Sequence, residues 1–491
     1  MQLYDKDLLS MQEVRELVEA AKEAQKELAN MSQSQVDHIV RAIADAGVRN
    51  ARRLAEMAHE DTGFGKVEDK IIKNIFGSRG VYEYVKDMKT VGELERDEEK
   101  KVRTIAVPVG VIAGLVPSTN PTSTALYKAE IAIKAGNAIV FSPHPTALRC
   151  ISETVKVIRQ AISEAGGNEN LVSCITIPTM EATDNLMRHR DVAMILATGG
   201  SAMVRAAYSS GPPAIGVGPG NGPAYLEKTC DLPLAVKRIM DSKTFDNGTI
   251  CASEQSIIVT REMERAVTEE LQRQGAYVLS DSEHTKLSKF ILRANGTMNP
   301  AIVGKSVETV AKLAGLDRVP ASARVLVARE TGVGRGYPYS NEKLGLILAY
   351  YVENDEPAVL ERCVEILEWE GAGHTFSIHA EDENVVKKFA ERVPASRVLV
   401  NTPSALGGIG ATTCLFPALT LGCGAVGGSS SSNNIGPLDL INIKRVAWGV
   451  RELEDIRAGN SASPWENGRS EVKVDDAMLQ ELVRQIVGRL M

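Results

Sequence analysis

One cysteine stands where a nucleophile would be both held and reachable. Cys251 lies in TFDNGTICASEQSIIV, between a polar turn at residues 246–248 and an apolar run at 255–259 that reads as a strand. A thiolate at such a junction is fixed by its flanks and can attack an electrophilic carbon. The position also suits a small buried side chain, because free cysteines usually behave as buried hydrophobes. This window alone leaves both interpretations open.

A glycine turn gives the second chemical signal. In ATGGSAMVRAAY, Thr198, Gly199 and Gly200 follow a strand pattern and precede a helical one. Their N–H groups and the positive end of the helix are therefore free for a phosphate, although glycines also fill such turns for steric reasons alone. GCGAVG, residues 422–427, matches G-x-G-x-x-G literally but runs into GGSSSSNN instead of a helix. That context argues against a dinucleotide fingerprint.

Alternating strand and helix patterns surround both signals. Helices are expected over residues 11–60, and from residue 102 helical stretches alternate with VGVIAGLV, AIVFSP, LVSCITIP, VAMILAT and PAIGVG. Near-continuous apolar strands joined by crossover helices predict an α/β fold with a doubly wound parallel sheet. Further strands are expected in QSIIVT, ARVLVA, LGLILAYYV, HTFSIHA and RVLVN. These runs predict a second α/β region.

The pattern divides the chain into five parts. We expect α/β domains over residues 1–231 and 232–426, followed by a Gly/Ser/Asn-rich and then strand-like segment over 427–457. Residues 458–476 have the composition of a linker. Apolar side chains recur at three- and four-residue steps over 477–491. This predicts a short amphipathic helix that either docks on the core or binds a partner.

Composition argues against several classes of protein. The 491 residues carry a net charge of -7 with no basic block, which argues against nucleic acid as a partner. The seven cysteines show no CxxC pair and no Cys/His metal spacing, so we expect free thiols and no metal site. The N-terminus lacks an apolar signal region, and the longest apolar run is too short to cross a bilayer. We therefore expect a cytoplasmic protein that makes no membrane contact.

Several long motifs, in order along the chain, resemble one family. TNPTSTALYKAEIAIKAGNAIVFSPHPTA, ILATGGSAMVRAAYSSGPPAIGVGPGN, KTFDNGTICASEQSIIV, VNTPSALGGIG and LTLGCGAVGG are similar to segments of the CoA-acylating aldehyde dehydrogenases. That group includes the aldehyde dehydrogenase half of bifunctional acetaldehyde–alcohol dehydrogenases and enzymes of bacterial microcompartments. The resemblance implies the aldehyde dehydrogenase fold, with a Rossmann-like cofactor domain, an α/β catalytic domain and a small β-element that joins subunits into dimers or tetramers.

The resemblance also implies a reaction and its residues. A short aldehyde, acetaldehyde or propionaldehyde, would be oxidised reversibly with NAD to an acyl-CoA through a thioester on Cys251. Oxyanion donors would be the Cys251 N–H and Thr119, with Asn120 beside it. Hydrolytic relatives carry a water-activating glutamate where this chain has Val217. Its loss favours transfer of the acyl group to coenzyme A over hydrolysis.

His374, in GAGHTFSIHA, matches a histidine of the acylating branch and would serve as a base for the incoming thiol. A structural histidine at the start of a strand is the alternative. For the cofactor, the resemblance implies that the Thr198-Gly199 turn lies near the pyrophosphate and that Glu342 bonds the nicotinamide ribose. An ordinary surface carboxylate is the alternative for Glu342.

A replaced segment bears on the adenosine end of the cofactor. Ser142, Pro143 and His144 stand where hydrolytic relatives have a lysine-containing segment that reaches the adenosine ribose. The resemblance implies that His144 contacts the adenosine part of NAD or coenzyme A, which share one cleft in this branch. The replacement leaves NAD or NADP open as the cofactor.

The tail departs from the family pattern, which ends near residue 450–460. The linker and helix over 458–491 resemble an encapsulation peptide that draws an enzyme to the shell proteins of a bacterial microcompartment. Confinement would suit a volatile, toxic aldehyde. Two other functions stay open: a dehydrogenase that passes the acyl group to water or phosphate, and a non-catalytic scaffold whose tail organises a shell.

Overall fold

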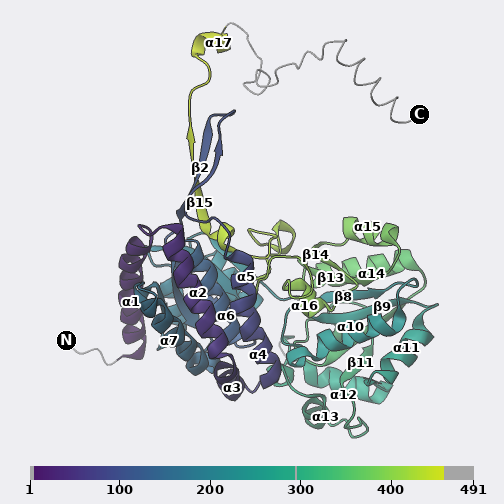
Figure 1. The fold of residues 1–491 in the computed structure, drawn as a ribbon. Helices are drawn as coiled ribbons and strands as arrows, with labels where there is room; N and C mark the ends of the chain where they lie inside the picture. The colour runs from purple at the N-terminus through teal and green to yellow at the C-terminus, as the bar shows by residue number, and fades with distance from the viewer. Residues whose placement is uncertain (1–4, 294–295, 458–491) are drawn as a thin grey trace, which may run out of the picture. The chain divides into compact units, whose positions relative to one another are not determined.

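The computed structural model of the chain describes residues 5–293 and 296–457 (Figure 1). The chain divides into two compact units, Met1–Thr90 with Pro108–Ile441, and Val91–Val107 with Asn442–Met491. The predicted linker at 458–476 and amphipathic helix at 477–491 lie outside the described residues. Within the described residues, no helix combines the length and apolar character needed to cross a membrane.

The first sheet of the larger unit has five parallel strands in the order β5-β4-β3-β6-β7. From β3 the chain proceeds through β4 to β5 on one side and then returns to build β6 and β7 on the other. The doubly wound sheet predicted from the apolar runs is therefore confirmed. The strands are β3 (Val111–Val116), β4 (Ala138–Pro143), β5 (Val172–Cys174), β6 (Val192–Thr198) and β7 (Ala214–Val217).

Helices cover this sheet, and every residue of β3 and β4 is buried. All residues of α6 are buried too, because α6 packs on the sheet and against α2 and α7. The helices around this sheet (Figure 1) are α1 (Lys6–Leu28), α2 (Gln33–Arg49), α3 (Ala51–Thr62), α4 (Val67–Ile75), α5 (Val81–Val85), α6 (Pro121–Lys134), α7 (Leu148–Glu164), α8 (Met180–Met187) and α9 (Ser201–Tyr208).

The second sheet has seven parallel strands in the order β10-β11-β12-β9-β8-β13-β14. Each strand predicted for this region is present, and β8 also belongs here, although the second domain is predicted to begin only at residue 232. The strands are β8 (Gly222–Leu226), β9 (Glu254–Thr260), β10 (Ala276–Val278), β11 (Val325–Arg329), β12 (Ile347–Glu353), β13 (Gly373–His379) and β14 (Ala395–Val400). Helices packed in this half are α10 (Leu232–Thr244), α11 (Glu264–Arg273), α12 (Asp281–Ile291), α13 (Val307–Ala314), α14 (Glu356–Trp369), α15 (Glu383–Arg392) and α16 (Ser404–Gly408).

The smaller unit is a three-stranded sheet in the order β1-β2-β15, made of β1 (Gly92–Asp97), β2 (Val102–Pro108) and β15 (Ile441–Ala447), with α17 (Leu453–Arg457) after it. The β1–β2 pair is antiparallel. Beyond β15, the Trp448 N–H donates to the Lys101 carbonyl at 3.2 Å, and the Arg103 guanidinium lies 5.0 Å from the centre of the Trp448 ring. Ile443 and Val446 are exposed on β15.

Candidate active site

Strands β3, β4, β6 and β7 of the first sheet end at one cavity. The segments after β3, β4, β6 and β7 line a cavity of about 380 Å³. The strand order reverses between β3 and β6, and ligands of open parallel sheets bind outside the carboxyl ends at such a point. Lys128 of α6 ties the two strand ends together, because its Nζ donates to the carbonyls of Leu115 (2.7 Å) and Leu196 (2.9 Å). The fold therefore fixes the mouth of a ligand site.

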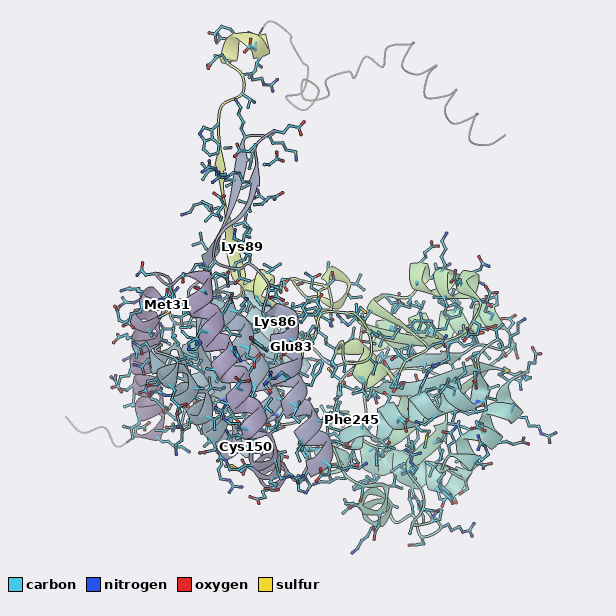
Figure 2. All side chains as sticks on the ribbon, in the orientation of Figure 1. Met31, Glu83, Lys86, Lys89, Cys150 and Phe245 are labelled. Atoms are coloured by element: carbon cyan, nitrogen blue, oxygen red, sulfur yellow. The ribbon has the colours of Figure 1, made fainter. Side chains whose placement is uncertain are left out.

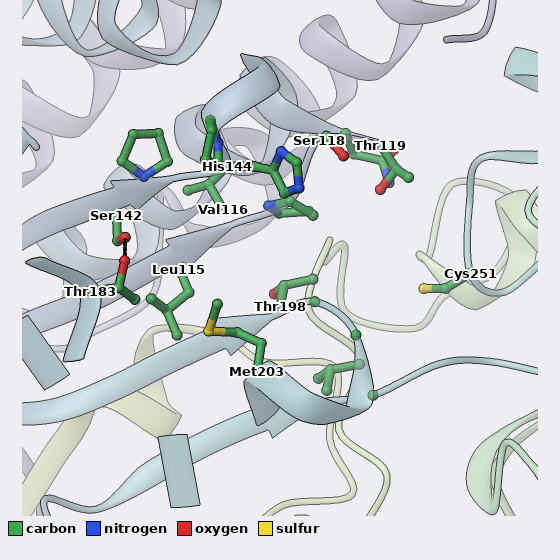
Figure 3. Close-up of a pocket in the computed structure, with 18 of the residues that line it drawn as sticks. Leu115, Val116, Ser118, Thr119, Ser142, His144, Thr183, Thr198, Met203 and Cys251 are labelled. Carbon is green, nitrogen blue, oxygen red and sulfur yellow. Dashed lines mark hydrogen bonds between the residues drawn. The ribbon is translucent and has the colours of Figure 1, made fainter. Parts of the chain in front are cut away.

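The cavity brings together all but one of the predicted site residues. Figure 3 shows the Sγ of Cys251 directed into it from the side opposite Ser142, whose hydroxyl lies 2.9 Å from that of Thr183. His374 is not part of the lining. The predicted residues that line the cavity are Thr119, Asn120, Ser142, Pro143, His144, Thr198, Gly199, Gly200, Cys251 and Glu342.

A left-handed turn delivers Cys251. Asp246, Asn247 and Gly248 have φ values of 46°, 53° and 72° in succession. Asp and Asn tolerate this conformation better than other side chains, and glycine tolerates it best. A Cβ at Gly248 would also lie 2.8 Å from the carbonyl oxygen of Gly345. The polar residues predicted as a turn are thus needed for the backbone path that ends at Cys251.

The turn is held by a buried carboxylate. Asp246 accepts hydrogen bonds from the Lys66 N–H (2.7 Å), Lys70 Nζ (3.0 Å), the Thr249 hydroxyl (2.7 Å) and Lys73 Nζ. Burial alone would raise the pKa of Asp246, but Lys73 and Lys70 outweigh burial and lower it. Burial lowers the pKa of Lys73 to about 8, against the opposing pull of Asp246. Helix α4 is therefore bound to the nucleophile loop by ion pairs.

Asn120 transmits this brace to the cavity. Its Oδ1 accepts from Lys73 Nζ at 2.6 Å, and its Nδ2 donates to the Thr249 carbonyl and the Thr119 hydroxyl, both at 3.2 Å. Because both amide hydrogens have acceptors, Asn120 orients its neighbours. The Thr119 hydroxyl accepts in this arrangement and keeps its own proton for a ligand. The geometry therefore favours Thr119 over Asn120 as the donor to an oxyanion.

The cavity offers one thiol and one carboxyl group among its described lining residues. Burial raises the pKa of Cys251 to about 12. Glu342 is the one carboxyl group among the described lining residues, and its Oε1 accepts from the Gly220 N–H at 2.8 Å. Burial, followed by the nearby Glu370, raises the pKa of Glu342 well above its usual range. Val217, where hydrolytic relatives would carry their glutamate, ends β7 as an apolar part of the lining.

His374 lies behind the nucleophile loop instead of in the cavity. It is fully buried, its Nδ1 lies 2.9 Å from the Thr375 hydroxyl, and burial with the neighbouring Arg397 lowers its pKa to about 3. A Cβ at Gly220 would lie 2.2 Å from the Cys251 carbonyl oxygen and 3.0 Å from Nδ1 of His374. Only glycine fits between the two. The imidazole is thus uncharged and adjacent to the Cys251 main chain, and its role as a base stays a prediction.

Other candidate signals do not reach the site. Cys150 is buried in α7, where its Sγ donates to the Ala147 carbonyl (Figure 2). The literal G-x-G-x-x-G segment forms only a short 3-10 turn at Ala425–Gly427 and opens no α-helix. Across residues 5–293 and 296–457, no three His, Cys, Asp or Glu side chains are grouped so that they could hold a metal ion.

Sequence reasoning missed the supporting residues. Lys70, Lys73 and Asp246 look like surface charges, because their pairing joins segments that lie far apart in the chain. Arg397 did give a signal: in SRVLVN it shares strand parity with the apolar Leu399, so it points to the same side of β14 as a core residue.

The profile of the aldehyde dehydrogenase family matches residues 4–313. The chain belongs to the aldehyde dehydrogenase family. It is 44% identical over 440 residues to a bifunctional aldehyde-alcohol dehydrogenase of Escherichia coli, covering 89% of this chain and 49% of that protein. The chain thus spans about half the length of the bifunctional relatives. It is 36% identical over 441 residues to an acetylating succinate-semialdehyde dehydrogenase of Clostridium kluyveri, covering 90% of this chain and 97% of that protein.

Solved aldehyde dehydrogenases have the same fold. A probable aldehyde dehydrogenase of Listeria monocytogenes is 64% identical, with a TM-score of 0.92, covering 92% of this chain and 100% of that one. A propionaldehyde dehydrogenase from a fucose utilisation microcompartment of Clostridium phytofermentans is 26% identical, with a TM-score of 0.80 and coverages of 90% and 98%. A propionaldehyde dehydrogenase of Rhodopseudomonas palustris, solved with coenzyme A and an acylated cysteine, is 27% identical, with a TM-score of 0.79 and coverages of 89% and 97%.

Proposed function

We propose that this chain is a CoA-acylating aldehyde dehydrogenase that oxidises a short aldehyde with NAD and passes the acyl group to coenzyme A. The observation that carries the proposal is the Cys251 thiol directed into a cavity whose described lining holds a single carboxyl group, Glu342, already bonded to the Gly220 N–H. A thiol can carry the acyl group there, and the apolar Val217 offers no carboxylate that could turn water into hydroxide. The acylated cysteine and bound coenzyme A of the Rhodopseudomonas palustris structure support a route in which the cysteine carries the acyl group before coenzyme A receives it.

In this mechanism the Cys251 thiolate attacks the aldehyde carbon, and the new C–S bond places negative charge on the carbonyl oxygen. The Cys251 N–H and the Thr119 hydroxyl stabilise that charge. Loss of a hydride then leaves a thioester on Cys251; the bound nicotinamide supplies the hydride acceptor. The thiolate of coenzyme A forms a C–S bond to the acyl carbon, and the bond to Cys251 breaks. The imidazole of His374 would accept the thiol proton, which requires the ring to come within reach of the cavity from its place behind Gly220.

The residues present fit a dinucleotide. The turn at Thr198-Gly199-Gly200 leads into α9, and a Cβ at Gly200 would meet nothing within 4 Å, so the backbone is open to a diphosphate. We assign this turn to the pyrophosphate and Glu342 to the nicotinamide ribose.

At the adenosine end we assign Ser142, Pro143 and His144, which follow from β4. His144 Nδ1 accepts the Thr146 N–H at 3.3 Å, so its Nε2 is the nitrogen that can donate to a ligand. This arrangement serves the adenosine part of NAD, NADP or coenzyme A equally well. Parallel titrations of NAD and NADP, each followed by quenching of tryptophan fluorescence, would rank the two dinucleotides.

The deciding experiment withholds coenzyme A. Mixing the protein with aldehyde and NAD should give one equivalent of NADH and a single acyl adduct on the peptide that contains Cys251, detected by mass spectrometry. Adding coenzyme A should remove the adduct and restart turnover. Continuous NADH release without coenzyme A would contradict the proposal: free acid would indicate a hydrolytic enzyme, and acyl phosphate in phosphate buffer a phosphorylating one. A Cys251→Ser variant should show neither adduct nor NADH.

The relatives differ in the aldehyde that they are named for, so the substrate needs its own test. We propose acetaldehyde or propionaldehyde. A panel of C2 to C4 aldehydes with sulfoacetaldehyde, compared by kcat/KM in the presence of coenzyme A, would rank them. An optimum at sulfoacetaldehyde would contradict the proposal of an uncharged short aldehyde.

We also propose that the tail directs the enzyme to a microcompartment shell and that the protein is a dimer or tetramer. The apolar spacing over residues 477–491 supports the first part, and the exposed apolar side chains of β15 support the second. Deleting residues 474–491 should leave turnover near normal and abolish co-purification with co-expressed shell proteins. An unfolded or inactive truncation would instead assign the tail to the core. Sedimentation velocity would give the number of subunits.

A further inference from the structure

A buried arginine lies next to the chemical centre, and the proposed mechanism does not use it. Arg397 is 4% exposed and sits on β14 directly opposite Thr375 of β13. Its Nη2 donates to the carbonyls of Gly422 (2.7 Å) and His374 (2.8 Å), and its Nε donates to the Thr375 hydroxyl (3.4 Å). The guanidinium is therefore fixed between the two strands and the glycine-rich segment after them.

The acceptors around Arg397 are all uncharged. Besides the groups above, it reaches the carbonyls of Gly373 and Ser432 and the amide oxygen of Asn434. No ion pair involving Arg397 occurs among the residues that the structure describes. Burying a cation without a carboxylate is costly, and hydrogen bonds to carbonyls leave its positive charge uncancelled. These hydrogen bonds hold the segments together, and the charge that they leave uncancelled acts on nearby ionisable groups.

The arginine is linked to Cys251 through two residues. Arg397 holds the carbonyl of His374, the His374 ring packs against Gly220, and Gly220 packs against the Cys251 carbonyl. The ionisable groups that act on Cys251 are Glu342, Cys423 and Arg397. Arg397 is the cation of that set, and it is also the charged group that acts on His374.

We propose that Arg397 is a positioning residue of this site: it holds His374 behind the nucleophile loop and supplies the positive charge that favours a thiolate at Cys251 and an uncharged imidazole at His374. The inference rests on the proposed role of Cys251 as nucleophile. A nearby cation stabilises a thiolate and destabilises an imidazolium. In agreement, Arg397 opposes the burial that raises the pKa of Cys251 and adds to the burial that lowers the pKa of His374.

The test measures the alkylation rate of the Cys251 thiol in the absence of the enzymatic reaction. The full-length protein, with no aldehyde, dinucleotide or coenzyme A, is alkylated with iodoacetamide from pH 6 to 10, and the Cys251 peptide is followed by mass spectrometry because Cys414 is exposed and also reacts. Arg397→Gln removes the charge and keeps part of the hydrogen bonding, whereas Arg397→Lys keeps the charge. Arg362→Gln is the matched control, because Arg362 is half-buried in α14 and bonded to Glu353 and the Thr331 carbonyl, away from the cavity.

Removing the charge should raise the apparent pKa of Cys251 by about one unit, which slows alkylation below that pKa about tenfold. Arg397→Lys and Arg362→Gln should stay within about threefold of the wild type, whatever their Tm. A folded Arg397→Gln protein whose Cys251 is alkylated at the wild-type rate from pH 6 to 10 would overturn the proposal. An equal loss of alkylation rate in folded Arg397→Lys would also overturn it. This second variant provides the test should Arg397→Gln not fold. If wild-type protein makes no acyl-CoA, the proposed function fails while this titration still stands.

Discussion

The nucleophile loop has a buried cation on each side, and the two cations differ in what surrounds them. On the first-sheet side, Lys73 meets the carboxylate of Asp246 and the Asn120 amide. On the second-sheet side, Arg397 meets only carbonyl, hydroxyl and amide oxygens. Both are almost fully buried, at 2% and 4% exposure. The comparison separates two uses of a buried charge near one sulfur atom.

A buried cation that is paired with a carboxylate fixes the positions of its neighbours, whereas a buried cation without a carboxylate keeps an electrostatic potential that acts on nearby groups. Asp246 offsets part of the potential of Lys70 and Lys73, and the pairs add directed hydrogen bonds that fix Asn120 and the turn before Cys251. Arg397 has no such cancellation, so its potential reaches the sulfur. Mutations on the first side should therefore change stability and alignment, and mutations on the second side should change protonation.

The largest effect is expected from Asp246→Asn, which keeps a side chain that tolerates the left-handed turn but leaves Lys70 and Lys73 buried without a carboxylate. Breaking a buried pair from one side costs about 3–5 kcal/mol, so urea unfolding should show a loss of that size. Adding Lys70→Met and Lys73→Met to Asp246→Asn should restore most of the stability but not turnover. A triple variant as unstable as the single one would contradict the ion-pair account.

The same cluster predicts a dependence on pH. The pKa of Asp246 is lowered in the folded protein, so its stabilisation is present above the unfolded value near pH 4 and is lost as pH falls through the folded value. Thermal unfolding from pH 7 to pH 3 should show this loss in the wild type, and the triple variant should show a smaller one. Parallel curves for the two proteins would assign acid sensitivity to other groups.

The next effect is steric. Gly220→Ala places a Cβ 2.2 Å from the Cys251 carbonyl oxygen, so the loop must shift. Overpacking of this kind costs about 1–3 kcal/mol, while a misplacement of the nucleophile by about 1 Å can lower kcat about a hundredfold. The acyl adduct on Cys251 is the readout, and Gly449→Ala, whose Cβ meets nothing within 4 Å, is the control. Normal adduct formation would mean that the loop accommodates the methyl group.

A smaller difference should separate the two lysines. Lys70 and Lys73 both bond Asp246, but Lys73 alone reaches Asn120. Lys70→Met and Lys73→Met should lower Tm by similar amounts. Lys73→Met should lower kcat about tenfold more than Lys70→Met does, because it also removes the hydrogen bond that orients Asn120. Equal kcat values for the two variants would remove Asn120 from the chain of contacts that orients Thr119.

The smallest effect is expected from Val217→Glu, which puts a carboxyl group into the cavity near the thioester. Release of free acid in the absence of coenzyme A should rise about tenfold, since general-base catalysis contributes about 10²–10⁴-fold when well placed and less when the group is not aligned. High-performance liquid chromatography of the acid product gives the measurement, with Val217→Gln as the uncharged control. Equal acid from both variants would contradict the view that a missing base protects the thioester.

The fold was predictable where strands are buried on both faces. The runs that form β3, β4, β6 and β12 are almost wholly apolar, so their pattern can be recognised without knowledge of neighbouring strands. Strand β8 was missed because GPAYL is short and contains glycine and proline, and its pairing with β9 and β13 decides its state. The β1–β2 hairpin was missed because β1, with the sequence GELERD, is polar and has no buried residue.

The site was predictable where a motif carries the chemistry in one stretch. The residues around Cys251, Thr198 and Ser142 were found in this way and line one cavity. Contacts between distant segments could not be found, because Lys73 and Asp246 lie 173 residues apart. The position of His374 behind Gly220, outside the cavity, depends on contacts between three segments that lie far apart in the chain, which no local pattern contains.

The size of the cavity has a consequence for the order in which the dinucleotide and coenzyme A bind. A space of about 380 Å³ is near the lower end of what one small-molecule ligand occupies, which favours one large ligand at a time beside Cys251. We expect the two ligands to bind in turn, with the reduced dinucleotide leaving before coenzyme A binds. An excess of either ligand would then inhibit binding of the other, so the ratio of their concentrations in the cell would set the rate of turnover.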